Sequence, residues 1–337
     1  MFDFRSDTVT QPTANMRQAM ANAIVGDDVY GDDPTVNKLE KMAADRYEFD
    51  AAIFCSSGTQ ANLLAIMAHC GRGDEYICGQ DAHNYRWEGG GAAVLGSVQP
   101  QPLANQADGS ISLDAIRANI KPEDDHHAKT KLLSLENTIG GKVLPLNYLA
   151  QAQALAFQHG LRIHLDGARV FNAAVKLNVD VTEITQYFDS VSICLSKGLA
   201  APVGSLLLGT TALIRSARRW RKVLGGGMRQ AGFLAAAGIL ALDEQVDQLA
   251  IDHQNTQYLA QQLLSLAEFK FELASVQTNM IFSQYTGSDP KALATFLRTK
   301  GIIISASSAI RFVVHKDITS TAIDLLVAEI QHFHRSC

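Results

Sequence analysis

The order of apolar and polar residues along the chain predicts a sheet of buried strands covered by helices. Several short segments are apolar throughout rather than alternating, which is typical of strands that are covered on both faces. Helical patterns such as "QANLLAIMAHC" and "LNYLAQAQALAFQHG" separate these segments, so the strands are expected to run mainly parallel. The predicted strands are residues 51–55, 75–79, 131–137, 161–168, 190–196 and 205–209.

The pattern changes near residue 243. A long amphipathic helix over residues 244–266 is followed by short strand-like and helical segments, an alternation typical of a small α+β domain. The first thirty residues are polar and carry few helix or strand signals, which indicates an extended arm. We therefore predict an N-terminal arm (residues 1–30), a large α/β domain (31–245) and a small C-terminal α+β domain (246–337).

Composition and charge exclude several classes of function. The 337 residues are 47% hydrophobic with a net charge of −5, which argues against a nucleic-acid-binding protein. The most apolar stretch, residues 231–242, is shorter than the roughly 18 residues that a membrane span needs. The five cysteines form no C-x-x-C pair, and the charged N-terminus is unlike a signal peptide. We expect a cytoplasmic protein without a metal site, a membrane partner or a nucleic-acid partner.

The segment "SSGTQAN" (residues 56–62) joins a predicted strand to a predicted helix. Gly58 allows the backbone to approach a ligand closely, and the Thr59 hydroxyl lies at the start of the helix, where an anion is favoured. A phosphate site is one interpretation. The other is an ordinary capped helix start, because Ser and Thr are common N-caps.

Asp166 and Lys197 each follow a buried strand. Ligands of open α/β sheets bind beyond the carboxyl ends of the strands, and burying an ammonium group is costly unless it has a partner. A phosphate site, a carboxylate and an amine together suit pyridoxal 5′-phosphate (PLP). Lysine bonds covalently to its aldehyde, and a carboxylate keeps its ring nitrogen protonated. The alternatives are an N-cap role or a salt bridge to Arg169 for Asp166, and a Lys197 side chain that reaches solvent.

Longer motifs extend this interpretation to the whole chain. The chain resembles the low-specificity threonine aldolases, in the aromatic amino acid β-eliminating lyase/threonine aldolase family of fold-type I PLP enzymes. The resemblance implies an aspartate aminotransferase-like large domain with a mainly parallel seven-stranded sheet, and a small α+β domain. The motifs that carry it, in order, are "DFRSDTVTQPT", "VGDDVYGDDPTVNKLE", "SGTQANLLA", "AHNY", "LLSLENT", "DGAR", "CLSKGL", "PVGSLL" and "RKVLGGGMRQ".

The resemblance also implies an activity and an assembly. The activity is the cleavage of L-threonine and L-allo-threonine to glycine and acetaldehyde. The assembly is a homotetramer, a dimer of dimers, whose active sites are shared between subunits. Two alternatives stay open: another PLP-dependent lyase or aminotransferase on the same fold, and a binding protein without catalysis.

The family's site residues map onto positions of this chain. Lys197, His83 and His126 are implied to be catalytic. The implied cofactor-binding residues are Ser57, Gly58, Thr59, His83, Asp166, Arg169, Lys197, Lys222 and Arg229. The implied substrate-binding residues are Ser6, Tyr30, His83, His126, Arg169 and Arg311. Among these, Tyr30, Lys222 and Arg229 are expected to come from, or to face, a neighbouring subunit.

The chain departs from the family pattern at two places. Ile139 and Gly140 replace a polar pair that is common in the family, and His127 stands beside His126 where relatives often have an aromatic residue. The sequence leaves open which of the two histidines faces the site.

Overall fold

The computed structural model describes residues 1–336, and its large domain is built on one seven-stranded sheet. The strand order is β2-β8-β7-β6-β5-β3-β4, and β8 alone runs antiparallel to its neighbours among these strands. This confirms the mainly parallel sheet. The strands are β2 (Ala51–Cys55), β3 (Asp74–Gly79), β4 (Gln99–Leu103), β5 (Lys129–Glu136), β6 (Arg162–Asp166), β7 (Ser190–Cys194) and β8 (Ser205–Gly209).

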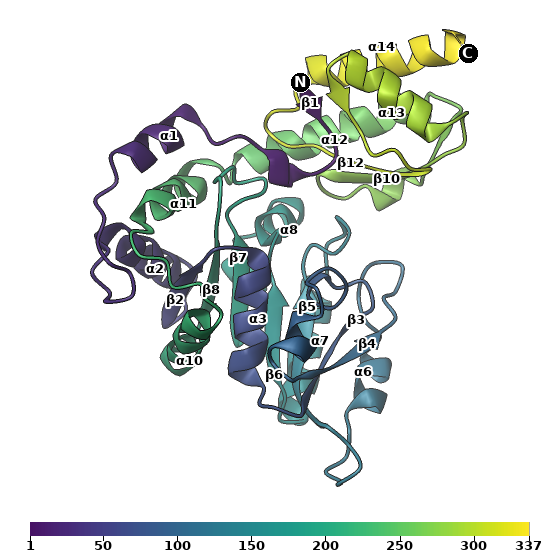
Figure 1. Ribbon diagram of the computed structural model, residues 1–337. Helices are drawn as coiled ribbons and strands as arrows, with labels where there is room; N and C mark the ends of the chain where they lie inside the picture. The colour runs from purple at the N-terminus through teal and green to yellow at the C-terminus, as the bar shows by residue number, and fades with distance from the viewer. Residues whose placement is uncertain (337) are drawn as a thin grey trace.

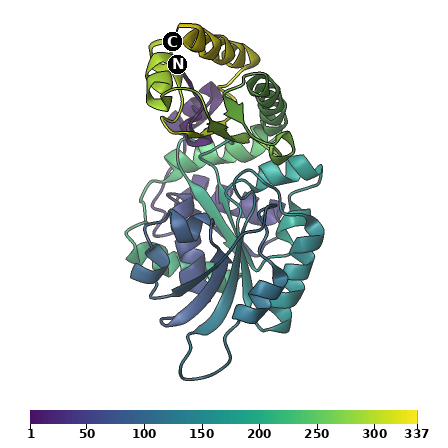
Figure 2. The ribbon, with the colours of Figure 1, turned by 90° about the vertical axis from the view of Figure 1, so that its right-hand side faces the viewer.

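Helices cover both faces of this sheet, as Figure 2 shows with the strands running between two layers of helices. Central residues such as Leu133, Leu165 and Ile193 are fully buried, which explains why the strands read as unbroken apolar runs. The helices of this part of the chain are α1 (Ala14–Ala21), α2 (Pro34–Arg46), α3 (Gly58–His69), α4 (His83–Arg86), α5 (Gly91–Val94), α6 (Leu113–Asn119), α7 (Leu146–Gln158), α8 (Val170–Leu177), α9 (Thr182–Thr185), α10 (Thr211–Val223) and α11 (Gly232–Glu244).

Strand β4 is the strand of this sheet that the hydrophobic pattern does not predict. Its sequence, "QPQPL", is polar and contains Pro100 and Pro102. Proline cannot donate a hydrogen bond to a neighbouring strand, so it is confined largely to edge strands. β4 lies at the edge of the sheet and pairs with β3 only, which is where such a sequence can form a strand.

The C-terminal part forms a second unit with its own core (Figure 1). Its three-stranded antiparallel sheet has the order β12-β10-β9. The division after residue 245 stays our proposed boundary, between the end of α11 and the start of α12. The elements are α12 (Gln248–Leu264), β9 (Phe269–Lys270), the 3-10 helix η2 (Leu273–Ser275), β10 (Met280–Tyr285), α13 (Pro290–Thr299), β11 (Ile302–Ile303), β12 (Ala309–Val313) and α14 (Ser320–Ser336).

The N-terminal arm is more structured than its sequence indicates. Strand β1 (Phe2–Asp3) pairs in parallel with β11, and Phe4 is fully buried in the core of the C-terminal unit. A short 3-10 helix, η1 (Asp7–Val9), follows, and α1 then packs on α11. The arm therefore ties the C-terminal unit to the large domain through contacts that are distant in sequence.

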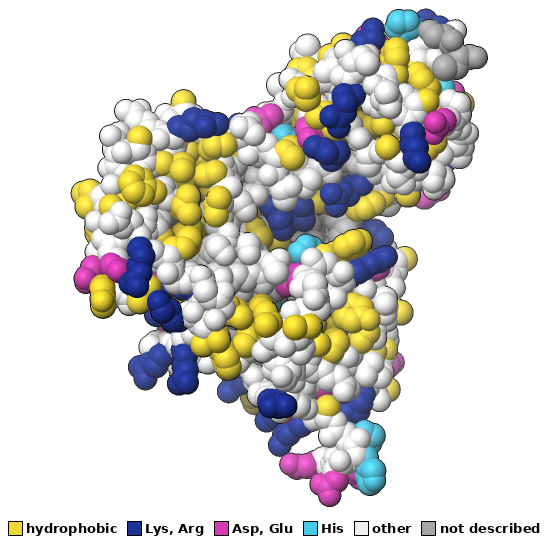
Figure 3. All heavy atoms as spheres, in the orientation of Figure 1, with side chains coloured by type: hydrophobic (Ala, Val, Ile, Leu, Met, Phe, Trp, Pro, Cys, Tyr) yellow, Lys and Arg dark blue, Asp and Glu magenta, His cyan; other side chains and the backbone are white. Residues whose placement is uncertain are grey.

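The carboxyl ends of β3, β5, β6 and β7 lie at the end of the large sheet that faces the C-terminal unit. Figure 3 shows a hollow between the two parts, with Lys and Arg side chains gathered in it. No helix among residues 1–336 is both long and apolar enough to cross a membrane.

Candidate active site

Asp166 lies where the sequence predicts it, at the carboxyl end of a central strand. It is the last residue of β6 and is 1% exposed. One carboxylate oxygen accepts a hydrogen bond from Asn62 Nδ2 at 2.7 Å, and the other accepts one from the Ala168 amide at 3.1 Å. With a donor on each oxygen the carboxylate is held in one orientation, from which it can accept a hydrogen bond from a protonated ring nitrogen.

Lys197 follows the end of β7 by three residues and is partly buried. Its positive charge acts on Asp7 and Glu136 and favours the ionised form of each. Burial and the nearby Asp166 charge nevertheless raise the pKa of Glu136 above the usual range of a carboxyl group. The amine of Lys197 therefore lies among acidic groups at the same edge of the sheet as Asp166.

The start of α3 lies beside this lysine segment. Ser57 caps the helix, and its Oγ accepts a hydrogen bond from the Gln60 amide at 3.1 Å. A Cβ atom added at Gly58 would lie 2.6 Å from Cys194 Sγ, so only glycine lets the helix start this close to the end of β7. The first N–H groups of α3 have no partner within the helix, and with the exposed Thr59 they form an anion site next to Lys197.

Helix α3 also connects the anion site to the carboxylate. Asn62 is four residues after Gly58, so it lies on the same face of the helix one turn later, and it bonds directly to Asp166. The start of α3 and the carboxylate are thereby connected through one helix. Their chemistry fits PLP: the helix start suits the phosphate, Asp166 the ring nitrogen and Lys197 the aldehyde.

His83 begins α4, immediately after the turn that follows β3. Its backbone amide donates to Glu136 Oε2 at 2.7 Å, and its Nδ1 lies 2.8 Å from Glu88 Oε1. The hydrogen bond with Glu88 raises the pKa of His83, although burial opposes the shift. Ligand atoms of His83, Glu88 and Asp166 all lie within 4.8 Å of one another, so His83 adjoins the proposed position of the cofactor ring.

The substitution Glu88→Gln is expected to move the acidic limb of the kcat/KM profile to lower pH. His83 acts as a base only when it is neutral, and Glu88 raises its pKa, so removing that charge lets His83 stay neutral at lower pH. The profile is measured from pH 5 to 9. Glu123→Gln, an exposed glutamate in the loop before β5, is the control and should leave the limb in place. An unmoved or raised limb in Glu88→Gln would contradict this role of His83.

A second group of charges lies between the arm, the large domain and the C-terminal unit. Arg169 forms two hydrogen bonds to the fully buried carboxylate of Asp7, at 2.8 and 2.6 Å. Arg311, on β12, donates to the Arg5 carbonyl, and its pKa is lowered by burial and by the nearby Arg169 guanidinium. Ser6 precedes Asp7 in the same segment. Two guanidinium groups and a hydroxyl near Lys197 form a site that favours a carboxylate ligand.

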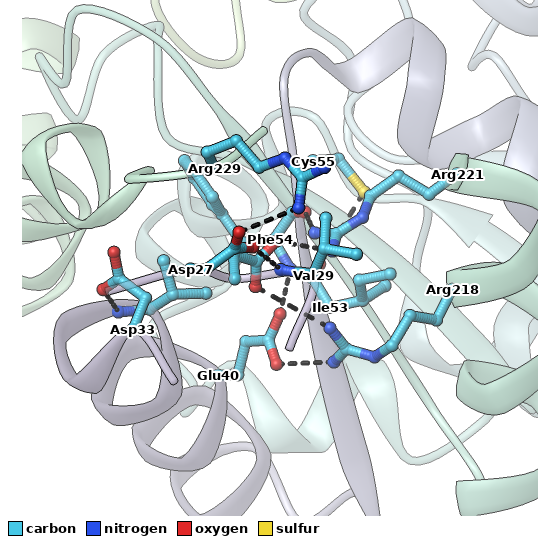
Figure 4. A network of polar contacts seen from close by, with 12 residues as sticks. Asp27, Val29, Asp33, Glu40, Ile53, Phe54, Cys55, Arg218, Arg221 and Arg229 are labelled. Atoms are coloured by element: carbon cyan, nitrogen blue, oxygen red, sulfur yellow. Dashed lines mark hydrogen bonds and ion pairs between the residues drawn. The ribbon is translucent and has the colours of Figure 1, made fainter. Parts of the chain in front are cut away.

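The acidic segment of residues 26–33 is held against β2 by arginines, as Figure 4 shows. Asp27 pairs with Arg229 at 2.8 Å, and the buried Asp28 pairs with Arg221 at 2.6 Å. Arg221 also donates to the carbonyl of Phe54, near the end of β2, at 2.6 Å. This segment carries Tyr30, which is 77% exposed.

The structure does not bring every predicted site residue together within one chain. His126 lies in the exposed loop before β5, so it is at the opposite end of the sheet from Lys197 and pairs with Asp124. Within one chain His126 does not lie near Lys197, so its role near the substrate hydroxyl stays a prediction that needs a neighbouring subunit. His127 is exposed in the same loop. Lys222 and Arg229 are exposed, and Gly226 between them lies against the Gln60 side chain in the first turn of α3.

Ile139 has a structural role where relatives often carry a polar residue. It is 7% exposed and belongs to the main hydrophobic core. Gly140, which follows it, adopts a φ of 55°. This departure from the family pattern adds apolar packing and does not place a polar side chain in the site.

Sequence reasoning missed several residues that complete the site: Asp7, Asn62, Glu88, Glu136, His164 and Asn279. Glu136 carried the same signal as Asp166, an acidic residue at the end of a buried strand. Asn62 also carried a signal, because a position four residues after Gly58 shares its helix face. The contacts of Asp7 with Arg169 and Asn279 span 162 and 272 residues of sequence, and no local pattern reports them.

Comparison with known proteins decides the family. The model of the β-eliminating lyase family matches residues 3–286. The chain belongs to this family. Its members use PLP as cofactor, in agreement with the chemistry of the site. A low specificity L-threonine aldolase of Escherichia coli K12 is 53% identical over 319 residues, which cover 95% of both chains.

Two further comparisons agree. A probable low-specificity L-threonine aldolase of Arabidopsis thaliana is 45% identical over 338 residues, covering 97% of this chain and 95% of the relative. The solved structure of Leishmania major threonine aldolase superimposes with a TM-score of 0.82 at 20% identity, covering 99% of both chains. At that identity the superposition shows the fold alone, and it confirms the fold class predicted from the sequence.

Proposed function

We propose that this β-eliminating lyase family member is a low-specificity L-threonine aldolase, which cleaves L-threonine and L-allo-threonine to glycine and acetaldehyde. The observation that supports this most directly is the meeting of Lys197, Asp166 and the start of α3 at one sheet edge, in a chain whose close curated relatives carry that name. Such an enzyme is a carbon–carbon lyase that consumes threonine and forms glycine.

The cofactor, when bound, supplies an electron-withdrawing ring that accepts the electrons of the broken Cα–Cβ bond. The chain's own residues hold that ring. We propose that Ser57, Gly58 and Thr59 bind the phosphate, that Asp166 accepts a hydrogen bond from the ring nitrogen, and that Lys197 bonds to the aldehyde. We propose that Arg169 would contact the ring's phenolic oxygen.

Orientation of the substrate is the second task of the site. We propose that Arg311 and Ser6 bind the substrate carboxylate and thereby hold the Cα–Cβ bond perpendicular to the ring, the direction in which its electrons can delocalise. Arg169 is already engaged by Asp7 through two hydrogen bonds. This arrangement leaves Arg311 as the guanidinium that can turn from the Arg5 carbonyl towards an incoming carboxylate.

The β-hydroxyl proton needs a base. We propose His83 for this role, because Glu88 fixes Nδ1 as the donor and leaves Nε2 as the nitrogen that can accept a proton. When a single histidine contacts the β-hydroxyl, the configuration at Cβ is only loosely constrained. The carboxylate-binding residues and Lys197 fix Cα more strictly, which supports activity on both L-diastereomers.

The proposal is tested with purified protein, PLP and the four stereoisomers of threonine. Glycine and acetaldehyde are expected from L-threonine and L-allo-threonine, and the D-isomers should remain unchanged. Strong activity on D-threonine, or pyruvate from L-serine as the main product, would support another PLP-dependent lyase on the same fold. Absence of turnover despite PLP binding would support a binding protein without catalysis.

We also propose that the enzyme is a homotetramer, a dimer of dimers, with active sites completed across subunit interfaces. The exposed Tyr30, Lys222 and Arg229 support this assembly, since each is positioned to meet a neighbour. His126, too, could reach a Lys197 site only from another subunit. The four cysteines of the described chain are free and buried, and we propose that the protein works in the cytoplasm, where thiols stay reduced.

A subunit-mixing experiment tests the shared site. Lys197→Ala and Arg229→Ala proteins, each nearly inactive, are dissociated and reassembled together. Random pairing makes half of the dimers hybrids. If Arg229 acts across the interface, one of the two sites in each hybrid is intact. About one quarter of wild-type activity should therefore return. Mass spectrometry of tagged subunits verifies exchange. If exchange is complete and no activity returns, Arg229 acts within its own chain.

A further inference from the structure

A line of buried hydrogen bonds leads from the far end of α3 back to Asp166. His69, the last residue of α3, places Nε2 2.7 Å from Ser190 Oγ, and the same oxygen is 2.9 Å from His164 Nδ1. His164 Nε2 lies 3.3 Å from Asn62 Oδ1, and Asn62 Nδ2 lies 2.7 Å from Asp166 Oδ2. Ser190 and His164 are fully buried, and Asn62 is 2% exposed. We call this set of residues the relay.

The amide of Asn62 determines the direction of the relay. Its Nδ2 lies 2.7 Å from Asp166 and 2.9 Å from Glu88 Oε1, and two carboxylates require a donor. Its Oδ1 therefore faces Ser192 Oγ, at 2.8 Å, and the ring of His164. An amide oxygen only accepts hydrogen bonds, so both of these neighbours must donate to it.

The remaining protons follow from this constraint. His164 donates through Nε2, and burial lowers its pKa to about 4, so the ring is neutral and its Nδ1 must accept from the Ser190 hydroxyl. That hydroxyl has one proton and must itself accept from His69 Nε2. Burial likewise lowers the pKa of His69, to about 3. Each donor in the line therefore points towards Asp166.

One competing arrangement exists. The backbone of Ser190 also lies within reach of the His164 ring, and a proton on Nδ1 could be directed there. The lone pair of Nε2 would then face the Asn62 oxygen, two acceptors against each other. Only the arrangement with the proton on Nε2 leaves each of these buried polar atoms satisfied.

We infer that the relay is a positioning device for Asp166: aligned donors from His69 to Asn62 hold its carboxylate in one orientation, aimed at the ring nitrogen of the cofactor. The inference rests on the proposed function only in so far as PLP binds at Asp166. Successive hydrogen bonds polarise one another in a region of low dielectric constant, so donors that do not touch Asp166 still strengthen the last bond to it. Asn62, His164 and His69 are thus positioning residues.

The first test measures PLP binding to the apo-protein of Asn62→Leu. The dissociation constant, from titration of the cofactor absorbance, should rise about tenfold or more, the range expected for loss of a hydrogen bond to a charged group. The matched control is Asn172→Leu, another buried asparagine that pairs with a histidine, His253, at 3.2 Å. It should lose similar thermal stability as apo-protein and keep PLP affinity within a factor of about two.

A second measurement is made on the wild-type protein, and variants serve only to assign its signals. Nitrogen-15 NMR of histidine-labelled wild-type holoenzyme reports which ring nitrogen carries the proton, and His164→Phe and His69→Phe spectra assign the signals. Both rings should be neutral with the proton on Nε2. A proton on Nδ1 of His164, a charged ring, or equal PLP affinities of the two leucine variants would overturn the inference. None of these outcomes depends on threonine cleavage, so a different substrate would leave them unchanged.

Discussion

Lys197→Ala is expected to lose turnover by at least about a thousandfold, the scale seen when a covalent catalyst is removed, while the protein still folds. Lys197 is the amine at the sheet edge beside Asp166 and the start of α3, and without it no covalent link to PLP forms. Borohydride reduction of the wild-type holoenzyme, followed by peptide mapping, should place the cofactor on Lys197. Turnover is measured as acetaldehyde release.

Lys176→Ala serves as the control for that experiment. Lys176 lies on α8 and is exposed. This variant should retain wild-type turnover and the covalent label on Lys197. A label on any other lysine in the wild type would show that the assignment of the amine is wrong, whatever the activity of the variants.

Asp7→Ala is expected to lower the free energy of unfolding by about 3–5 kcal/mol, the usual cost of leaving one partner of a buried ion pair alone. Asp7 is fully buried and Arg169 nearly so, with 14% of its side chain exposed. The loss is measured by urea denaturation of the apo-protein at one fixed protein concentration, because assembly also contributes to stability. Asp27→Ala is the control: its partner Arg229 is 58% exposed, so about 0–1 kcal/mol is expected.

The pair of Asp7 and Arg169 also predicts that the stability of the protein depends on pH. Burial alone would raise the pKa of Asp7, but the Arg169 guanidinium, its hydrogen bonds and the Lys197 charge hold that pKa well below its usual range. A carboxyl group with a lowered folded-state pKa stabilises the fold above its unfolded pKa of about 4, and the stabilisation is lost as the pH falls further. The difference between wild type and Asp7→Ala should be constant from pH 5 to 8 and should shrink below pH 4. A constant difference down to pH 3 would contradict the ionised pair.

Much of the fold could be predicted because most of its strands are buried on both faces. Unbroken apolar runs identify β2, β3, β5, β6, β7 and β8 within a few residues of their observed bounds. The edge strand β4 lacks that signal, since an edge strand needs neither a continuous apolar run nor every backbone donor. The short strand β1 was missed for a different reason: it forms only because β11, far away in sequence, offers an edge to pair with.

The candidate site likewise contains residues that a local sequence pattern marks and residues that it does not. Gly58, Asp166 and Lys197 each stand at a junction that a local pattern marks: a glycine at a helix start, or a charged residue after a buried strand. Sequence alone therefore determined the cofactor chemistry. It did not determine where His126 lies. A loop before a strand and a loop after it look alike in composition, yet they lie at opposite ends of the sheet.

The sequence by itself determined the α/β class and the positions of Gly58, Asp166 and Lys197 at the ends of strands or the start of a helix, because each depends on a few neighbouring residues and on the burial of one strand or helix. Only the tertiary structure decided that Asp7 neutralises Arg169 and that Asn62 joins α3 to Asp166, contacts that span 162 and 104 residues. These are pairings of buried polar groups, and a buried polar group bonds to whatever the packing of the whole chain brings within reach.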